Sequence, residues 1–224
     1  MAPELLTRGA GGRSAGPDTL VRVEGGKRWA LIRFSWRNRE EHVARVFLSV
    51  GSNLGDRLEC MRRAVAELRA MPGVEFLDAS ALYRTEPWEQ RPGQQPDENT
   101  WFFNCAVSIE TTLDPMALLV RVQEVEKKLG RHRGPGTPED QRYDPRPLDI
   151  DILLYGDMVI SGPDLLHIPH LLMHERRFVL QPLAELAPDT EHPVLYRTIR
   201  ELLEKLDDEH RIVGVDLPRR WFER

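Results

Sequence analysis

The side chains in this sequence that point most specifically to a chemical function are two aspartates, two positions apart. Asp149 and Asp151 lie in the segment RPLDIDILLYGD, among apolar neighbours that predict a buried strand. Ionised carboxylates are rarely buried without a partner. Residues i and i+2 share one face of a strand, so both carboxylates should point the same way, with Cα atoms roughly 7 Å apart. Such a pair suits Mg²⁺, and two ions can clamp a phosphoryl transfer; a solvated strand edge is the alternative.

Arginines and histidines flank this segment on both sides. Arginines on a loop beside a metal site suit a polyphosphate ligand, and such a loop can close when the ligand binds. A structural network of ion pairs is the alternative for the same residues. The chain has no GxxxxGK[ST] motif, so it is not a P-loop enzyme. The flanking residues are Arg131, His132, Arg133, Arg142, Arg146, His167, His170, His174, Arg176 and Arg177.

The elements that would position these residues follow a β-α-β-β-α-β order, which is the ferredoxin-like arrangement. Asp56 is a predicted cap for the first helix, and Asp114 with Pro115 predicts the start of the second, which stops at Gly130. A loop containing HIPHLLMHERRFVL and a last helix near YRTIRELLEKLDD complete the chain. The predicted core elements are a strand over 46–50, a helix over 56–70, strands over 74–85 and 101–112, a helix over 114–129 and the strand of the two aspartates.

Several motifs together resemble the 6-hydroxymethyl-7,8-dihydropterin pyrophosphokinase family of folate biosynthesis. They occur in the family's order from about residue 46 to about residue 190: FLSVGSNLGDR, YRTEP, FFNCAV, EVEKKLGR, PRPLDIDILLYGD and IPHLLMHERRFVLQPLAELAP. The resemblance implies an α+β fold with a ferredoxin-like βαββαβ core and an antiparallel sheet with helices on both faces, a three-layer α/β/α sandwich. It also implies an enzyme that transfers pyrophosphate from ATP, its co-substrate, to the pterin and leaves AMP, with two Mg²⁺ ions.

The resemblance assigns roles to residues by their positions in these motifs. Asp149 and Asp151 would bind the metal ions. The implied catalytic residues are Arg133, Arg142, Arg146 and Asp149; the ATP-binding residues are Gln123, Glu126, Arg131, Ile152, His170 and Arg176; the pterin-binding residues are Thr85, Glu86, Trp88, Phe102, Asn104 and Phe178.

The residue types at the pterin positions fit a flat heterocycle. Two aromatic faces, here Phe102 and Phe178, hold such a ring well, and an Asn side chain suits its amide and amine edge. Strand alternation puts Phe103 in the core with Cys105, whereas Phe102 shares its face with Asn104. Gln123 and Glu126 are three apart and share a helix face, for which a solvated face is the alternative.

The sequence departs from the family in the loops. The loop between Arg133 and Arg142 and the loop after Thr85 are longer than expected, and Tyr143-Asp144 stands where the family often has Trp-Gly. Two other functions stay open at this point: a metal-dependent nucleotidyltransferase and a ferredoxin-like ligand-binding module. The first usually has a Gly-Ser shortly before its paired aspartates, whereas Ser52 is nearly a hundred residues from Asp149.

Composition sets the remaining expectations. The net charge of −5 over 224 residues does not favour a general nucleic-acid surface. Cys60 and Cys105 form no CxxC motif, and no apolar run is long enough for a membrane span, so we expect a cytoplasmic protein that binds no membrane. We expect a monomer with small-molecule substrates. Residues 1–44 are predicted as an N-terminal extension, either disordered or a hairpin around Gly25-Gly26, and residues 45–224 as a single pyrophosphokinase catalytic domain.

Overall fold

A computed structural model describes residues 18–22, 29–33, 43–88, 97–131, 145–161 and 166–223. Its main sheet is antiparallel and six-stranded, in the order β10-β5-β6-β3-β7, with β4 pairing with β6 beside this path. The βαββαβ order predicted from the sequence is present, with β4 and β5 together taking the place of the second strand. The strands are β3 (Ala44–Ser52), β4 (Val74–Ala79), β5 (Tyr83–Thr85), β6 (Phe102–Thr111), β7 (Asp149–Tyr155) and β10 (Ile212–Gly214).

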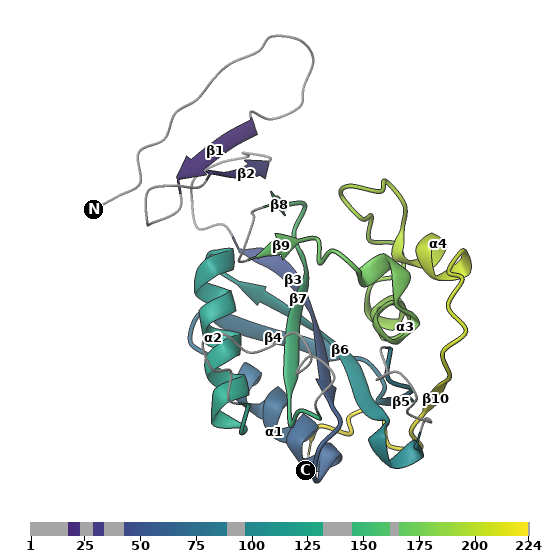
Figure 1. Cartoon of the computed structure of the whole chain (residues 1–224). Coiled ribbons are helices and arrows are strands. Elements are labelled where there is room, and N and C mark those ends of the chain that lie inside the picture. The colour runs from purple at the N-terminus through teal and green to yellow at the C-terminus, as the bar shows by residue number, and fades with distance from the viewer. Residues whose placement is uncertain are drawn as a thin grey trace.

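Helices cover both faces of the sheet, which confirms the three-layer sandwich. Helices α1 (Arg57–Arg69) and α2 (Pro115–Lys128) lie on one face, and α3 (Arg177–Leu186) and α4 (Ile199–Glu204) on the other (Figure 1). Each interface has its own apolar cluster. Ile150 and Ile152 of β7 point into the α1/α2 cluster, whereas Leu153 packs with α3. The apolar residues of β7 therefore anchor it between two cores, and its first residues lie at one end of the main sheet.

The caps of the first two helices are those that the sequence predicts. The Asp56 side chain accepts a hydrogen bond from the Glu59 N–H at 3.0 Å, and Asp114 accepts one from the Ala117 N–H at 2.8 Å. Each bond satisfies one of the N–H groups that the first turn of a helix leaves open. Both helix starts are thus fixed by local sequence.

The predicted strand over 74–85 is wrong in one respect, because it is interrupted between β4 and β5. Ser80 lies in the break and is fully buried. Its N–H donates to the Ala106 carbonyl and its hydroxyl accepts from the Ala106 N–H, both at 2.9 Å. A side-chain oxygen thus replaces a backbone carbonyl in the ladder, which lets the strand kink while its hydrogen bonds stay satisfied.

Helix α3 lies where the sequence analysis expected a loop. Pro182 sits inside this helix, and an internal proline normally argues against one. Val179, Leu180 and Leu183 are buried at helical spacing against the second apolar cluster, and this burial outweighs the lost backbone bond. The helix matters for function because it begins at Arg177, directly after Arg176 and one residue before Phe178.

A second, smaller sheet involves the N-terminal segment. Strand β1 (Asp18–Arg22) pairs with β2 (Trp29–Arg33), β2 pairs with β8 (Val159–Ser161), and β8 with β9 (His167–Ile168). These strands lie beyond the end of the main sheet at which β7 ends (Figure 1). Among the described residues, no helix is both long and apolar enough to cross a bilayer.

Candidate active site

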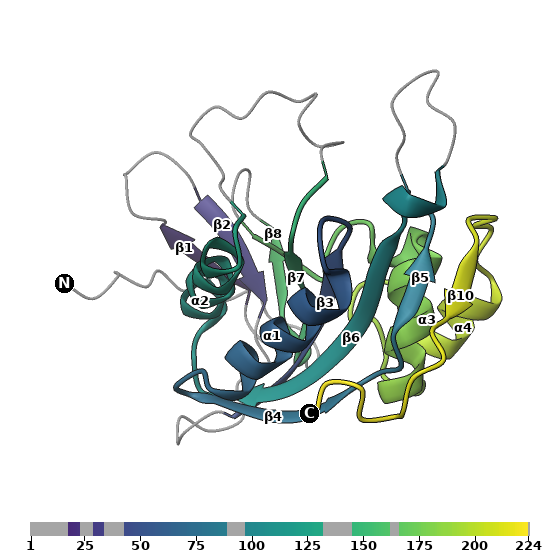
Figure 2. The same ribbon diagram turned by 90° about the horizontal axis from the view of Figure 1, so that it is seen from below.

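Strand register brings the predicted site residues to one end of the main sheet. Gly51 near the end of β3 lies opposite both Asp149 and Asn104, and Thr85 at the end of β5 lies opposite Phe102. These strand ends are at the upper edge of the sheet in Figure 2. Residues from four segments far apart in sequence thus form one neighbourhood.

A network of carboxylates and arginines lies at the start of β7. Arg131 donates through Nη1 to both Asp149 and Glu126, and Arg146 Nη1 donates to Asp149 Oδ2 at 2.8 Å. Glu126 Oε1 also accepts the Ile150 N–H at 2.8 Å, so α2 is tied to β7. The Glu126 and Arg131 side chains are 4% and 11% exposed, so water screens this network little.

The segment before Asp149 is held by contacts that the sequence analysis did not anticipate. The Arg146 N–H donates to Asn53 Oδ1 at 2.7 Å, and the Asn53 N–H donates to the Arg146 carbonyl at 3.2 Å. The Cys60 thiol donates to the Pro147 carbonyl at 2.9 Å. The signal available was the turn GSNLGD, which follows a strand ending at the same edge of the sheet as Asp149.

Asp151 lies in an excess of negative charge. Burial, followed by the charges of Asp149 and Glu126, raises the pKa of Asp151 to about 7 against the opposing effect of Arg131 and Arg176. A bound cation would reverse this balance, and carboxylate oxygens are the ligands that Mg²⁺ prefers. No group of three metal-ligating side chains occurs in the described parts of the chain. A Mg²⁺ ion on Asp149 and Asp151 would therefore complete its shell with water and phosphate oxygens, as Mg²⁺ commonly does.

His170 is set up as a neutral hydrogen-bond donor. Burial, followed by the charge of Arg176, lowers the pKa of His170 to about 4 against an opposing effect of Asp149. Its Nδ1 accepts the Leu172 N–H at 3.3 Å, so in the neutral ring the proton is on Nε2. The His170 N–H donates to the Leu153 carbonyl at 2.9 Å, which anchors this loop to β7.

The predicted pterin residues lie on the side of the neighbourhood toward β5 and β6. Asn104 is buried, and its Nδ2 donates to Thr85 Oγ1 at 2.7 Å. A Cβ on Gly51 would lie 2.5 Å from Asn104 Oδ1, so the absence of a side chain at Gly51 lets the amide fit. The Phe178 ring contacts the Trp88 ring, with 6.4 Å between centroids. Arg176 Cζ lies 5.7 Å from the Phe178 centroid, which joins the two ends of the site.

The remaining predicted site residues differ from one another in exposure and in contacts. Gln123 is exposed on α2, while Ile152 is buried in the α1/α2 core, so a ligand can meet only its backbone. Glu86 exchanges hydrogen bonds with the backbone of Arg211, one of 3.0 Å and one of 2.9 Å, and is thereby tied to the C-terminal segment. Arg133 and Arg142 lie outside the described residues.

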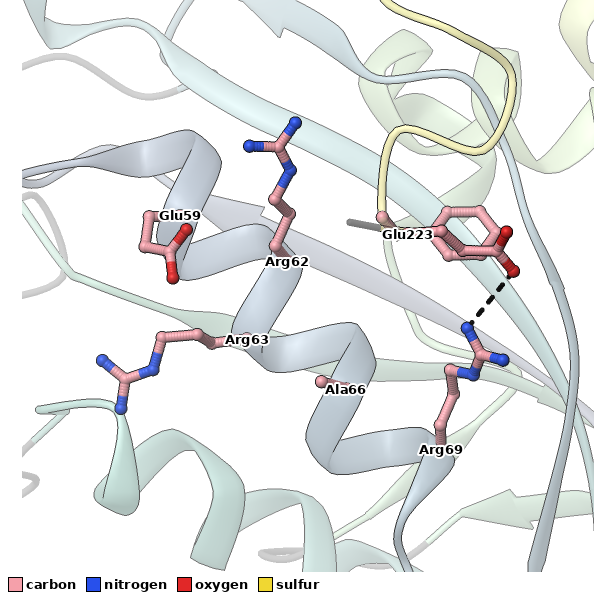
Figure 3. Close-up of a pocket in the computed structure, with 7 residues that line it drawn as sticks. Glu59, Arg62, Arg63, Ala66, Arg69 and Glu223 are labelled. Carbon is pink, nitrogen blue, oxygen red and sulfur yellow. Dashed lines mark hydrogen bonds and ion pairs between the residues drawn. The ribbon is translucent and has the colours of Figure 1, made fainter.

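A hollow of about 490 Å³ lies elsewhere, on the outer face of α1 (Figure 3). Arg62, Arg63 and Arg69 line it, but Glu59 and Glu223 do so as well, and Arg69 pairs with Glu223 at 3.4 Å. The acidic residues offset most of the positive charge, and none of the residues predicted for the site lines this hollow. We assign it no function.

Comparison with known proteins identifies the family. The family model described as 7,8-dihydro-6-hydroxymethylpterin-pyrophosphokinase matches residues 47–188. The chain belongs to this family. The matched range contains the network around Asp149 and all the residues assigned to the pterin.

Individual relatives of this pyrophosphokinase family agree. The chain is 41% identical over 165 residues to the 2-amino-4-hydroxy-6-hydroxymethyldihydropteridine pyrophosphokinase of Methylorubrum extorquens, covering 74% of this chain and 95% of that relative. The enzyme of the same name from Aquifex aeolicus is 35% identical, over 71% of this chain and 90% of the relative.

A solved structure supports the fold alone. HPPK-DHPS of Plasmodium falciparum superposes with a TM-score of 0.55 at 16% identity, covering 75% of this chain. This chain spans 46% of that longer one.

Proposed function

We propose that this chain transfers pyrophosphate from ATP to 6-hydroxymethyl-7,8-dihydropterin, giving AMP and the pterin diphosphate in folate biosynthesis. The observation that carries the proposal is the arginine–carboxylate network on Asp149, which lies at the same end of the sheet as the buried Asn104 amide in a chain of the pyrophosphokinase family. Neither a nucleotidyltransferase nor a non-catalytic binding module has an observation in its favour.

The ATP end of the site needs hydrogen-bond donors that lie along the negatively charged triphosphate. Arg131 and Arg146 each donate to Asp149 and would exchange part of this pairing for phosphate oxygens, to which guanidinium groups bind well. His170 would donate its Nε2 proton to a phosphate oxygen without adding charge. Arg176 stands between the phosphates and the pterin, and we assign further nucleotide contacts to Gln123, Glu126 and the backbone of Ile152.

Asp149 and Asp151 are the residues that would hold Mg²⁺. When bound, two Mg²⁺ ions would neutralise triphosphate charge and orient the transferred group. The shared face of the two carboxylates and the raised pKa of Asp151 support this assignment. The catalytic roles of Arg133 and Arg142 rest on the sequence motifs.

The pterin end needs a polar edge and apolar faces. Thr85 fixes the Asn104 amide, so the second Nδ2 proton and Oδ1 keep a set direction toward a heterocycle edge. Phe102 and Phe178 would lie against the ring faces, and Trp88 and Glu86 would close the pocket from the loop after β5. Holding the hydroxymethyl group in line with the β-phosphorus supplies much of the rate in such a transfer.

The wider assignments belong to the same proposal. We expect residues 45–224 to form the catalytic domain and residues 1–44 an extension of it. We also expect a monomeric, cytoplasmic enzyme whose partners are its two substrates, without nucleic acid or membrane.

AMP release with ATP, Mg²⁺ and the reduced pterin tests the proposal. Asp149→Asn and Asp151→Asn should each lower kcat by at least about 100-fold while the chain stays folded, because each removes a charged Mg²⁺ ligand. Asp157→Asn is the control, since Asp157 is exposed in the turn after β7 and should leave kcat unchanged. Wild-type activity in both site variants, or activity undiminished in EDTA, would contradict the metal assignment.

A further inference from the structure

The C-terminal segment lies outside the family match but reaches the pterin end. The match ends at residue 188, whereas β10, at residues 212–214, pairs with β5. In this register Ile212 lies opposite Thr85, the residue that orients Asn104. Figure 2 shows β10 along the edge of β5, next to α3 and α4. This segment therefore adds a strand to the side of the sheet that binds the pterin.

An aspartate fixes the segment to the start of α3. The Arg177 N–H donates to Asp208 Oδ2 at 2.7 Å, and the Arg177 side chain donates to the Asp208 carbonyl at 3.0 Å. Asp208 Oδ1 accepts the His210 N–H at 3.0 Å and lies 2.6 Å from His210 Nδ1. The Asp208 side chain is only 1% exposed, so these bonds are protected from water. Asp208 is thus anchored to Arg177, one residue before Phe178, and sets the direction of the His210 ring.

The His210 ring lies against Trp88. Their ring centroids are 4.9 Å apart with 33° between the ring planes, which is a close, tilted ring contact. Trp88 also contacts Phe178, and Arg176 Cζ lies 5.8 Å from the Trp88 centroid. Trp88 therefore contacts both a histidine from the C-terminal segment and residues at the start of α3.

We infer that His210 is a positioning residue for pterin binding, which holds the Trp88 ring as one wall of the pterin pocket while Asp208 orients His210. This role rests on the proposed function. Trp88 belongs to none of the described helices or strands, so a wall formed by its ring needs a partner from another element to keep one orientation. The C-terminal segment supplies that partner through His210, which lies outside the residues that the family model matches.

Steady-state kinetics of the full chain tests the inference. His210→Ala should raise KM for the pterin about 3- to 10-fold, as expected for a lost ring contact, and leave KM for ATP unchanged. His210→Phe keeps a ring against Trp88 and should restore KM to within about 2-fold of wild type. Asp208→Asn should raise the same KM, because it weakens the bond that orients the ring. Glu209→Ala, an exposed neighbour, is the matched control.

The outcomes separate this role from a structural one. An unchanged pterin KM in His210→Ala, equal increases in both KM values, or failure of His210→Phe to restore binding would each overturn the inference. Thermal unfolding should show all variants folded at the assay temperature; a loss of fold in His210→Ala leaves the Phe and Asp208→Asn variants to decide. A wild-type chain that releases no AMP would instead contradict the proposed function.

Discussion

Glu126 is the buried carboxylate on which the site network most depends, and its removal should cost stability in a graded way. It accepts the Ile150 N–H and pairs with Arg131, which in turn pairs with Asp149. Glu126→Ala leaves a buried N–H without its acceptor and removes one of the two carboxylates from Arg131. Glu126→Gln keeps an acceptor for Ile150 and removes only the charge.

The expected losses follow from these contacts. Breaking a buried ion pair by removing one partner costs about 3–5 kcal/mol, which is the range for Glu126→Ala. A hydrogen bond to a charged group contributes about 1.5–3 kcal/mol, which sets the upper range for Glu126→Gln. Urea unfolding resolves the two, since a loss of 3 kcal/mol shifts the midpoint by about 1 M or more at ordinary m-values.

Glu124→Gln is the matched control, because it is the same substitution two residues away on α2. Glu124 pairs with Arg121 at 3.2 Å, but both side chains are at least half exposed, so the loss should be under about 1 kcal/mol. Equal effects of Glu126→Gln and Glu124→Gln would refute the role given to the buried charge. Equal effects of the Ala and Gln variants at Glu126 would refute the separate contribution of the Ile150 hydrogen bond.

Two further predictions concern packing and pH. Gly51→Ala should lower the free energy of unfolding by about 1–3 kcal/mol and raise KM for the pterin, because the new Cβ meets Asn104. Gly214→Ala is the control and should do neither, because the space around Gly214 is open. Similar effects of the two substitutions would contradict the packing argument. Burial and then the charge of His174 lower the pKa of His192 to about 4, and its Nδ1 accepts the Val194 and Leu195 N–H groups. Because this folded-state pKa lies below the unfolded value of about 6.5, unfolding free energy should fall as the pH drops from about 6.5 to about 4. His192→Gln should reduce that slope in urea titrations, and an identical slope would refute it.

Local chemistry explains which parts of the fold could be predicted. The caps at Asp56 and Asp114 act within their own helical turns, and the alternation at the start of β7 reflects burial of Ile150 and Ile152 on one face, so short windows of sequence contain both signals. Helix α3 was missed because Pro182 opposes it locally while distant apolar residues stabilise it. The break at Ser80 likewise depends on a partner, Ala106, that only the folded sheet provides.

In the site too, some features could be predicted from short stretches of sequence and others depend on the folded structure. The shared face of Asp149 and Asp151 follows from strand geometry, and the family motifs carry the roles proposed for the surrounding residues. The pairing of Arg131 with both Glu126 and Asp149, and the support of Arg146 by Asn53, depend on how α2 and the turn after β3 meet β7. His210 had no motif to mark it, since its relation to Trp88 arises from the pairing of β10 with β5.

The central claim is that the β- and γ-phosphates of ATP move together to the pterin, and isotope distribution tests it directly. ATP labelled at the β- or γ-phosphorus should transfer either label to the pterin diphosphate in equal yield, with unlabelled AMP formed in a one-to-one ratio. Recovery of the β label in ADP would indicate simple phosphoryl transfer, and recovery of both labels in free pyrophosphate would indicate nucleotidyl transfer. Either distribution would contradict the account.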